Sequence, residues 1–308
     1  MLKEEKLKHQ VKFGVMTDLH HGLMHDAPWR LSIFLDSCLE KNVDFIIQLG
    51  DFCDYQLSET QQNAVVIPYN KFPRPSYHVL GNHDMDLCSK EEILKLLGSP
   101  SPYYSFDCNG YHFIVLDCNY YFEGGTYLHY CNGNYKKEHE YDCYLPLEEL
   151  QWLEEDLKMT SLPTILFSHQ CLKEEVHGLN NGRQLRQIIQ RSGKKVKLAI
   201  NGHNHMDDLQ MLEEVLYMNL NSISNQWLGE EYSTKRYGKP YDKKFPCLKM
   251  TAPYQDPLFA IITADEKSID IQGVESKYVG KSPYELHYPF NRFWREGAPR
   301  VSSHFIIL

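Results

Sequence analysis

Side chains of metal-binding type gather directly after five short apolar runs of this sequence. They are aspartate, asparagine and histidine, which bind divalent cations through carboxylate oxygen, amide oxygen and imidazole nitrogen. The five clusters are Asp18-Leu19-His20, Gly50-Asp51, Gly81-Asn82-His83-Asp84, His169 and Gly202-His203-Asn204-His205. One Asp-x-His or His-x-His triplet is common by chance, and Gly-Asp or Gly-Asn alone usually marks a turn. The repetition of such clusters after successive apolar runs is what indicates a shared metal site.

The number of ligand-type side chains in these clusters exceeds what one tetrahedral ion can bind. The candidates are Asp18, His20, Asp51, Asn82, His169, His203 and His205. Because this set contains imidazoles and no cysteine, it favours Mn, Fe or Zn. It matches neither a zinc site built from thiolates nor a calcium site built only from oxygen ligands. Seven ligands suit two ions if one carboxylate spans both, and two metals about 3.5–4 Å apart are a known device for phosphoryl chemistry. We therefore expect a two-metal site whose local positive charge attracts phosphate.

The apolar runs that precede the clusters have the length and composition of buried strands. They are residues 13–16, 45–49, 77–80, 165–167 and 198–200, with one more run at 113–116. Helices are expected after Pro28 and over 91–97 and 147–157, and a hairpin over 259–274. This alternation indicates an α/β fold with a central sheet, whose strand ends share one edge. On extended backbone, the i, i+2 spacing of Asp18 with His20 and of His203 with His205 would point each pair to one side.

The ordered set D-x-H, G-D-x-x-D, G-N-H-D, a lone His and G-H-x-H, over about residues 11 to 224, resembles the calcineurin-like metallophosphoesterases. The resemblance implies two packed mixed sheets flanked by helices. It also implies one metal on Asp18, His20 and His205, a second on Asn82, His169 and His203, and Asp51 as the bridge. His83 would lie above the metals without binding them and would donate a proton to the leaving oxygen. Asp84, the other catalytic candidate, is expected to orient a ligand or His83, as Asp54 is.

Within that family, the closest signature is that of the class III cyclic-nucleotide phosphodiesterases and the manganese-dependent ADP-ribose/CDP-alcohol diphosphatases. The expected function is hydrolysis of small phosphodiesters or phosphomonoesters, including nucleotides, by attack of a metal-bridging hydroxide. One alternative is a pyrophosphatase of nucleotide-diphosphate conjugates such as ADP-ribose. Another is a non-catalytic scaffold that keeps the fold in order to bind partners. A missing ligand is the usual sign of a scaffold, and none of the seven is missing here.

Composition limits what else this 308-residue chain is expected to bind. Its formal net charge of −9 argues against a nucleic-acid polymer as partner, because that surface needs clustered Lys and Arg. No stretch approaches the roughly 18 consecutive apolar residues of a membrane helix, and the charged start MLKEEKLKHQ lacks the apolar region of a signal peptide. The nine cysteines form no C-x-x-C pair and are expected to be reduced thiols. We therefore predict a cytoplasmic protein with a small phosphate-ester substrate.

No linker or internal repeat divides the sequence into two halves. We predict one metallophosphoesterase domain over residues 11–274, followed by a C-terminal extension over 275–308. Two irregular, aromatic-rich segments, 119–145 and 226–257, interrupt the alternation of strands and helices. The first follows a strand that should end at the same edge as the polar clusters. Its tyrosines could stack a base or wall off the metals, and the alternative is a surface loop packed on itself.

Overall fold

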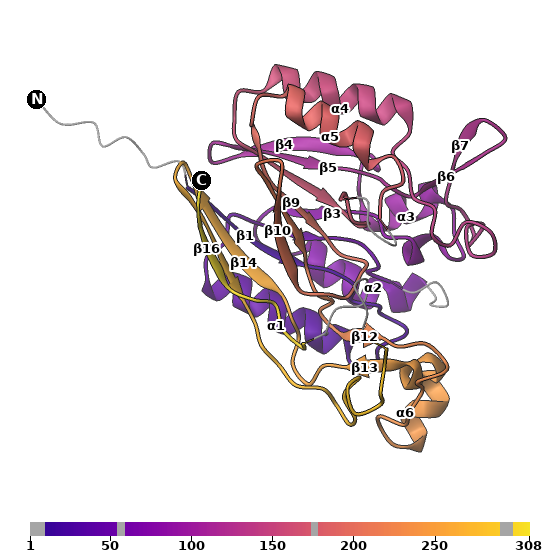
Figure 1. The fold of residues 1–308 in the computed structure, drawn as a ribbon. Helices are drawn as coiled ribbons and strands as arrows, with labels where there is room; N and C mark the ends of the chain where they lie inside the picture. Colours follow the sequence, from indigo (N-terminus) through magenta and orange to yellow (C-terminus); the bar gives the residue numbers. More distant parts are fainter. Residues whose placement is uncertain (1–9, 54–58, 174–177, 290–297) are drawn as a thin grey trace, which may run out of the picture.

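Two six-stranded mixed sheets form the centre of the computed structural model, which describes residues 10–53, 59–173, 178–289 and 298–308 (Figure 1). The first sheet contains β1 (Gln10–Met16), β2 (Phe45–Gln48), β3 (Ser76–His78), β14 (Ala260–Asp265), β15 (Ser268–Gly273) and β16 (His304–Ile307). The second contains β4 (Tyr104–Cys108), β5 (Tyr111–Val115), β8 (Thr164–Ser168), β9 (Val196–Asn201), β10 (Asp208–Leu212) and β11 (Val215–Asn219). Their strand orders are β16-β15-β14-β1-β2-β3 and β10-β11-β9-β8-β5-β4.

Helices cover the outer face of each sheet, so the molecule has four layers (Figure 1). The first sheet carries α1 (Ala27–Glu40), α2 (Glu59–Asn70) and α3 (Lys90–Leu97), and the second carries α4 (Leu147–Met159) and α5 (Gly182–Arg191). The expectation of two packed mixed sheets flanked by helices is confirmed. The alternation of strands and helices alone indicates a central sheet but does not reveal which strands pair, and the strands divide between two sheets.

Strand β1 shows why the strands of these two sheets appear in the sequence as continuous apolar runs. Phe13 and Val15 lie in the core between the two sheets, where the Phe13 ring packs edge-on against Phe113 and Phe167. On the other face, a Cβ at Gly14 would lie 2.3 Å from the Sγ of Cys38, so α1 packs directly on the strand. Both faces are therefore buried, which removes the alternation of apolar and polar residues that a half-exposed strand would show.

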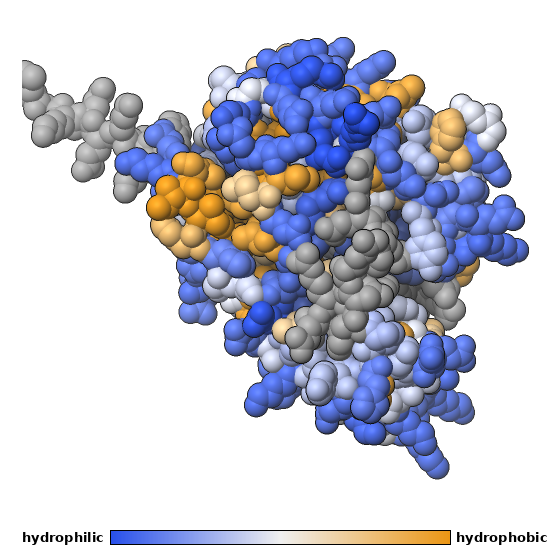
Figure 2. Space-filling model, viewed as in Figure 1, coloured by the Kyte–Doolittle hydropathy of each residue, from blue (hydrophilic) through white to orange (hydrophobic). Residues whose placement is uncertain are grey.

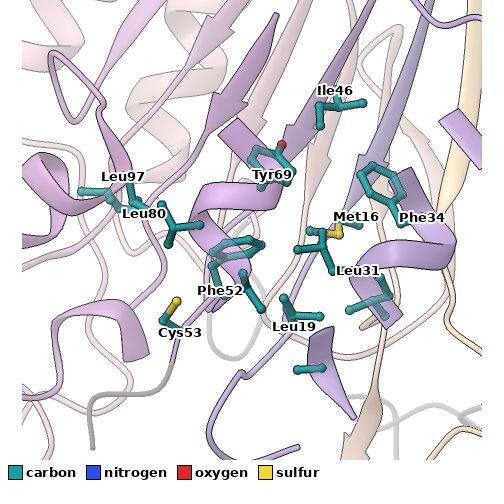
Figure 3. Close-up of a cluster of buried hydrophobic side chains, with 14 of the residues drawn as sticks. Met16, Leu19, Leu31, Phe34, Ile46, Phe52, Cys53, Tyr69, Leu80 and Leu97 are labelled. Atoms are coloured by element: carbon teal, nitrogen blue, oxygen red, sulfur yellow. The ribbon is translucent and has the colours of Figure 1, made fainter. Parts of the chain in front are cut away.

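Apolar neighbours of the candidate ligands anchor the loops that follow the strands. Leu19 separates Asp18 from His20, Phe52 and Cys53 follow Asp51, and Leu80 precedes Gly81. All four apolar side chains lie in the core under α1 and α2 and are at most 2% exposed (Figure 3). Because the core holds these side chains, the backbone is fixed where the polar side chains project.

The two irregular segments contain short elements of their own. Residues 119–145 include a hairpin of β6 (Tyr120–Glu123) and β7 (Thr126–His129), which projects from the body of the molecule (Figure 1). Residues 226–257 include α6 (Lys239–Lys244) and β13 (Thr251–Pro253), which pairs with β12 (Asn225–Trp227). Near the C-terminus, β16 pairs with β15 and Val301 lies in the core between the sheets. The domain boundary at residue 274 stays a prediction.

The surface is mostly hydrophilic in the view of Figure 2, with an apolar patch over the edge strand β16. Phe305 and Ile307 of that strand are exposed. Within the described ranges, no helix has the length and apolar character to cross a membrane. No two of the nine cysteines, all of which lie in the described ranges, are joined by a disulfide.

Candidate metal centre

The seven candidate ligands follow β1, β2, β3, β8 and β9, and so come from both sheets. Ligand atoms of Asp18, His20 and His205 lie within 4.8 Å of one another, and those of Asp51, His169 and His203 do the same. Asn82 adjoins the second group, because its Oδ1 lies 3.1 Å from Nε2 of His169. The structure therefore brings together all the residues that the sequence singled out as ligands.

The backbone of this site is strained. Five of the seven candidate ligands, Asp18, His20, Asp51, His203 and His205, have φ between 48° and 67°, the left-handed region. Residues other than glycine rarely adopt this conformation, and strain of this kind concentrates at functional sites. The expectation of extended backbone at the two i, i+2 pairs was therefore wrong. Each pair converges through a tight loop beyond the end of its strand.

The loops after β2 and β3 approach each other too closely for side chains at two glycines. A Cβ at Gly50, where φ is +97°, would lie 2.6 Å from the nitrogen of Gly81. A Cβ at Gly81 would lie 2.2 Å from the nitrogen of Asp51. These glycines therefore let the Asp51 loop and the Asn82 loop touch.

Asp84 joins the same two loops and is 2% exposed. Its carboxylate accepts the backbone N–H groups of Gly81, Asp51, Phe52 and Cys53 at 2.8–3.2 Å. Burial and then the charge of Asp51 raise the pKa of Asp84 to about 7, whereas the N–H donors favour its ionised form. Asp84 thus lies behind Asp51, where it can orient that residue. Asp54, the other predicted orienting residue, lies outside the described residues.

In the second ligand group, nitrogen and oxygen atoms of metal-binding type converge on Nε2 of His169. Nδ1 of His169 donates to the carbonyl oxygen of Leu49 at 2.7 Å, so Nε2 of the neutral ring carries the lone pair. That atom lies 3.1 Å from Oδ2 of Asp51, 3.1 Å from Oδ1 of Asn82 and 3.2 Å from Nδ1 of His203. Burial lowers the pKa of His169, but the Asp51 carboxylate outweighs it and raises that pKa to about 9. A proton or a metal cation must occupy this place.

The first ligand group repeats this arrangement. Nδ1 of His205 donates to the carbonyl oxygen of Asn225 at 2.6 Å, which leaves Nε2 at 3.3 Å from Oδ1 of Asp18 and 3.2 Å from Nε2 of His20. Oδ1 of Asp18 is buried and has no hydrogen-bond partner among the residues that the structure describes. Burial raises the pKa of Asp18, but His205 outweighs it and lowers that pKa to about 2. An orphaned carboxylate oxygen beside two imidazole nitrogens fits a divalent transition metal.

Asp51 lies between the two groups. Its Oδ2 is 3.1 Å from Nε2 of His169 in one group and 4.0 Å from Nε2 of His20 in the other, while its Oδ1 accepts the backbone N–H of His83 at 2.8 Å. Burial raises the pKa of Asp51, but His169 and His83 outweigh it and hold that pKa well below its usual range. A charged carboxylate in this position can reach an ion in each group.

His83 has a partner that sequence reasoning missed. Its side chain is 41% exposed, and its Nδ1 donates to Oδ2 of the buried Asp86 at 2.8 Å. Asp86 also accepts the hydroxyl of Tyr135 at 2.5 Å and pairs with Nζ of Lys136 at 2.7 Å. Burial opposes ionisation of Asp86, but His83 and Lys136 outweigh it and lower the pKa. The i, i+3 spacing of His83 and Asp86 on the turn His83–Met85 is a signal that could have identified the pair.

The comparisons with known sequences agree with the resemblance read from the motifs. Residues 11–207 match the family of calcineurin-like phosphoesterases. A manganese-dependent ADP-ribose/CDP-alcohol diphosphatase of Arabidopsis thaliana is 35% identical over 128 residues, which are 34% of this chain and 41% of that protein. Its namesake in Oryza sativa subsp. japonica is 32% identical over 87 residues, 25% of this chain and 27% of that protein. The chain thus spans less than half the length of these curated relatives.

Two solved structures share the fold over most of their length. A dimetal phosphatase from Danio rerio superposes with a TM-score of 0.64 and 15% identity, covering 88% of this chain and 99% of that one. GAP50, described as the anchor in the inner membrane complex of Plasmodium, superposes with a TM-score of 0.53 and 15% identity, covering 89% of each chain. At this identity, both likenesses concern the fold alone.

Proposed function

The chain belongs to the calcineurin-like phosphoesterase family, and from this premise we propose that it hydrolyses small phosphodiesters or phosphomonoesters with two divalent metal ions. The observation that carries the proposal is the position of the Asp51 carboxylate between two groups of converging lone pairs. That arrangement supports one ion on Asp18, His20 and His205, a second on Asn82, His169 and His203, and Asp51 as the shared ligand. Manganese is the first metal to test, because two relatives are manganese-dependent by name.

The metal ions, when bound, would polarise phosphoryl oxygens and lower the pKa of coordinated water toward neutrality. The carbonyl oxygens of Leu49 and Asn225 fix the imidazoles of His169 and His205 so that Nε2 of each points into the site. Thr17 and the backbone of His203 hold the Asp18 carboxylate, with Oδ1 left for a cation. Little reorganisation is then needed when the ions bind, which favours tight and geometrically defined binding.

His83 is the residue best placed to move a proton. Because its Nδ1 donates to Asp86, Nε2 is the ring atom that gains or releases a proton. The buried, ionised Asp86 stabilises the protonated ring and fixes its plane. The side chain of His83 is partly exposed and lies near His20, with ring centroids 5.6 Å apart. This position supports a role of His83 as general acid toward the leaving oxygen of the ester.

Hydrolysis of a nucleotide-diphosphate conjugate such as ADP-ribose is the second candidate. The identity to two diphosphatases supports it, although the aligned parts are short. A non-catalytic scaffold is the third, and the fold does not separate it from an enzyme. The complete set of seven ligands supports an enzyme. A cytoplasmic location and the lack of a nucleic-acid polymer as partner remain predictions from the sequence.

A hydrolysis panel on metal-defined protein separates these candidates. The protein is freed of metal with chelator, reloaded with Mn²⁺ and assayed with bis(4-nitrophenyl) phosphate, a nucleoside monophosphate, a 2′,3′-cyclic nucleotide and ADP-ribose. We expect Mn²⁺-dependent turnover of a diester or monoester and its loss in chelator. Turnover of ADP-ribose alone would favour the diphosphatase, and full metal loading without any turnover would favour the scaffold.

A further inference from the structure

The hydroxyl of Tyr135 lies between a candidate metal ligand and the carboxylate that holds His83. It accepts a hydrogen bond from Nδ2 of Asn82 at 3.2 Å and donates to Oδ1 of Asp86 at 2.5 Å. All three side chains are buried, with exposed fractions of 6% for Asn82, 2% for Tyr135 and 1% for Asp86. Because burial keeps bulk water away, solvent does not replace these bonds when one partner is removed.

Asp86 fixes the direction of the two bonds. Oδ2 of its carboxylate pairs with Nζ of Lys136 at 2.7 Å and accepts a hydrogen bond from Nδ1 of His83 at 2.8 Å, so the carboxylate is an anion and can only accept. The one proton of the Tyr135 hydroxyl therefore points to Oδ1 of Asp86, in a short bond of the kind that a carboxylate makes. Toward Asn82 the hydroxyl presents a lone pair, which the NH2 group of that amide fills.

This direction decides which end of the Asn82 amide faces the metal centre. The two ends of an amide are nearly equal in size and opposite in polarity. With Nδ2 directed to Tyr135, Oδ1 of Asn82 faces the second ligand group and lies 3.1 Å from Nε2 of His169. The opposite orientation would turn N–H groups toward the place of a cation and would set Oδ1 against the lone pair of Tyr135. The hydroxyl thus selects the orientation in which asparagine can bind a metal.

The position of the Tyr135 ring does not depend on its hydroxyl. The segment around it lies against the turn that bears Asp86, where the backbone N–H of Gly133 donates to the carbonyl oxygen of Met85 at 3.0 Å. A Cβ at Gly133, where φ is +65°, would lie 2.8 Å from the carbonyl oxygen of Asp86, so this close approach requires glycine. The ring itself stacks on Tyr130 with centroids 4.3 Å apart. Removal of the hydroxyl should therefore leave the ring in place.

We propose that Tyr135 is a positioning residue for the second metal ion and acts through the amide of Asn82. The inference rests on the proposed function, since it takes Asn82 as a ligand of that ion. The hydroxyl is not presented to substrate, because both of its bonds are made to buried protein groups. It keeps Oδ1 of Asn82 turned toward the ion, and its second bond ties this amide to the carboxylate that holds His83.

Tyr135→Phe tests the proposal by the loss of one oxygen atom. Metal-free protein is titrated with Mn²⁺ by calorimetry. We expect one ion to bind as in the parent and the other to bind about tenfold or more weakly, the usual cost of losing the outer partner of a metal ligand. Tyr130→Phe is the matched control. It removes the hydroxyl of the stacked ring, which donates to the carbonyl oxygen of Asp142, and should leave the affinities of both ions unchanged.

A second pair of variants shows whether the effect passes through the amide. In an Asn82→Asp background, the carboxylate offers an oxygen to the ion in either orientation, so its orientation no longer decides binding. Addition of Tyr135→Phe to this background should change the affinity of each ion by about twofold at most, and this non-additivity is the sign of a direct connection. A merely structural role of Tyr135 would weaken binding equally in the parent and Asn82→Asp backgrounds.

The outcomes separate this inference from the proposed function. If the parent binds two ions and Tyr135→Phe binds both as tightly, the two-metal centre stands and the positioning role is refuted. Equal weakening in the two backgrounds, or equal weakening by Tyr130→Phe, would also refute that role. A parent that never binds a second ion would instead contradict the proposed function, and the role of Tyr135 with it.

Discussion

Asp51→Asn is expected to weaken the binding of both metal ions and to lower kcat/KM by about 10³-fold or more, because the one charge shared between the ions is removed. Oδ2 of Asp51 lies 4.0 Å from Nε2 of His20 and 3.1 Å from Nε2 of His169, so asparagine would present a neutral amide to both groups. Oδ1 of Asp51 also accepts a hydrogen bond from the backbone N–H of His83, and the amide oxygen of the substituted asparagine can still accept it. Metal content by elemental analysis, measured with the rate, tests this expectation.

Two further variants show whether the effect belongs to the shared position. His20→Ala alters only the first group, so it should lose one ion and keep the second. Asp36→Asn, at an exposed position on α1, removes the same charge far from the site and should change neither metal content nor rate. An Asp51→Asn protein that keeps two ions and a rate within about tenfold of the parent would refute the shared role of Asp51.

His83→Ala is expected to keep both metals yet lose about 10²–10⁴ in kcat, the range for one general acid or base. The loss should be smaller for a nitrophenyl ester than for an alkyl ester, because nitrophenolate leaves without protonation. Rates for a series of esters of different leaving-group pKa, with metal content measured on the same samples, test the assignment.

The partner of His83 provides a second variant for the same experiment. Asp86→Asn keeps the shape of the side chain but removes the charge that stabilises the protonated ring, so we expect a smaller fall in kcat with the same dependence on the leaving group. Loss of a metal ion in His83→Ala, or an equal loss of rate on every leaving group, would mean that His83 is not the acid.

The candidate ligands could be found from sequence because residues of metal-binding type recur at the same position, directly after an apolar run. Asp or His follows each of the apolar runs at 13–16, 45–49 and 198–200 within a few residues. The carboxyl ends of neighbouring parallel strands lie at one edge of the sheet, so residues that follow these strands can meet there. The prediction could not supply the backbone that achieves the convergence. Left-handed conformations at residues such as Asp18 and His205 depend on contacts with other loops, which local spacing does not encode.

The residues around the ligands were harder to predict, because they depend on tertiary contacts. Tyr135 and Lys136 reach Asp86 across about fifty residues of sequence, from a segment without periodicity. Gln170 follows His169 directly, yet its hydrogen bond to Asn119 also spans about fifty residues of sequence. Helix α2 was also missed, since Pro68 and its polar residues obscure the helical pattern.

Titration of metal-free protein with Mn²⁺, with bound metal and hydrolysis of bis(4-nitrophenyl) phosphate followed together, is the most direct test of a two-metal hydrolase. The two ligand groups and the charged Asp51 between them predict that binding saturates at two ions per chain and that activity reaches its maximum only with the second. Full activity with one ion, or with none, would contradict the two-metal centre.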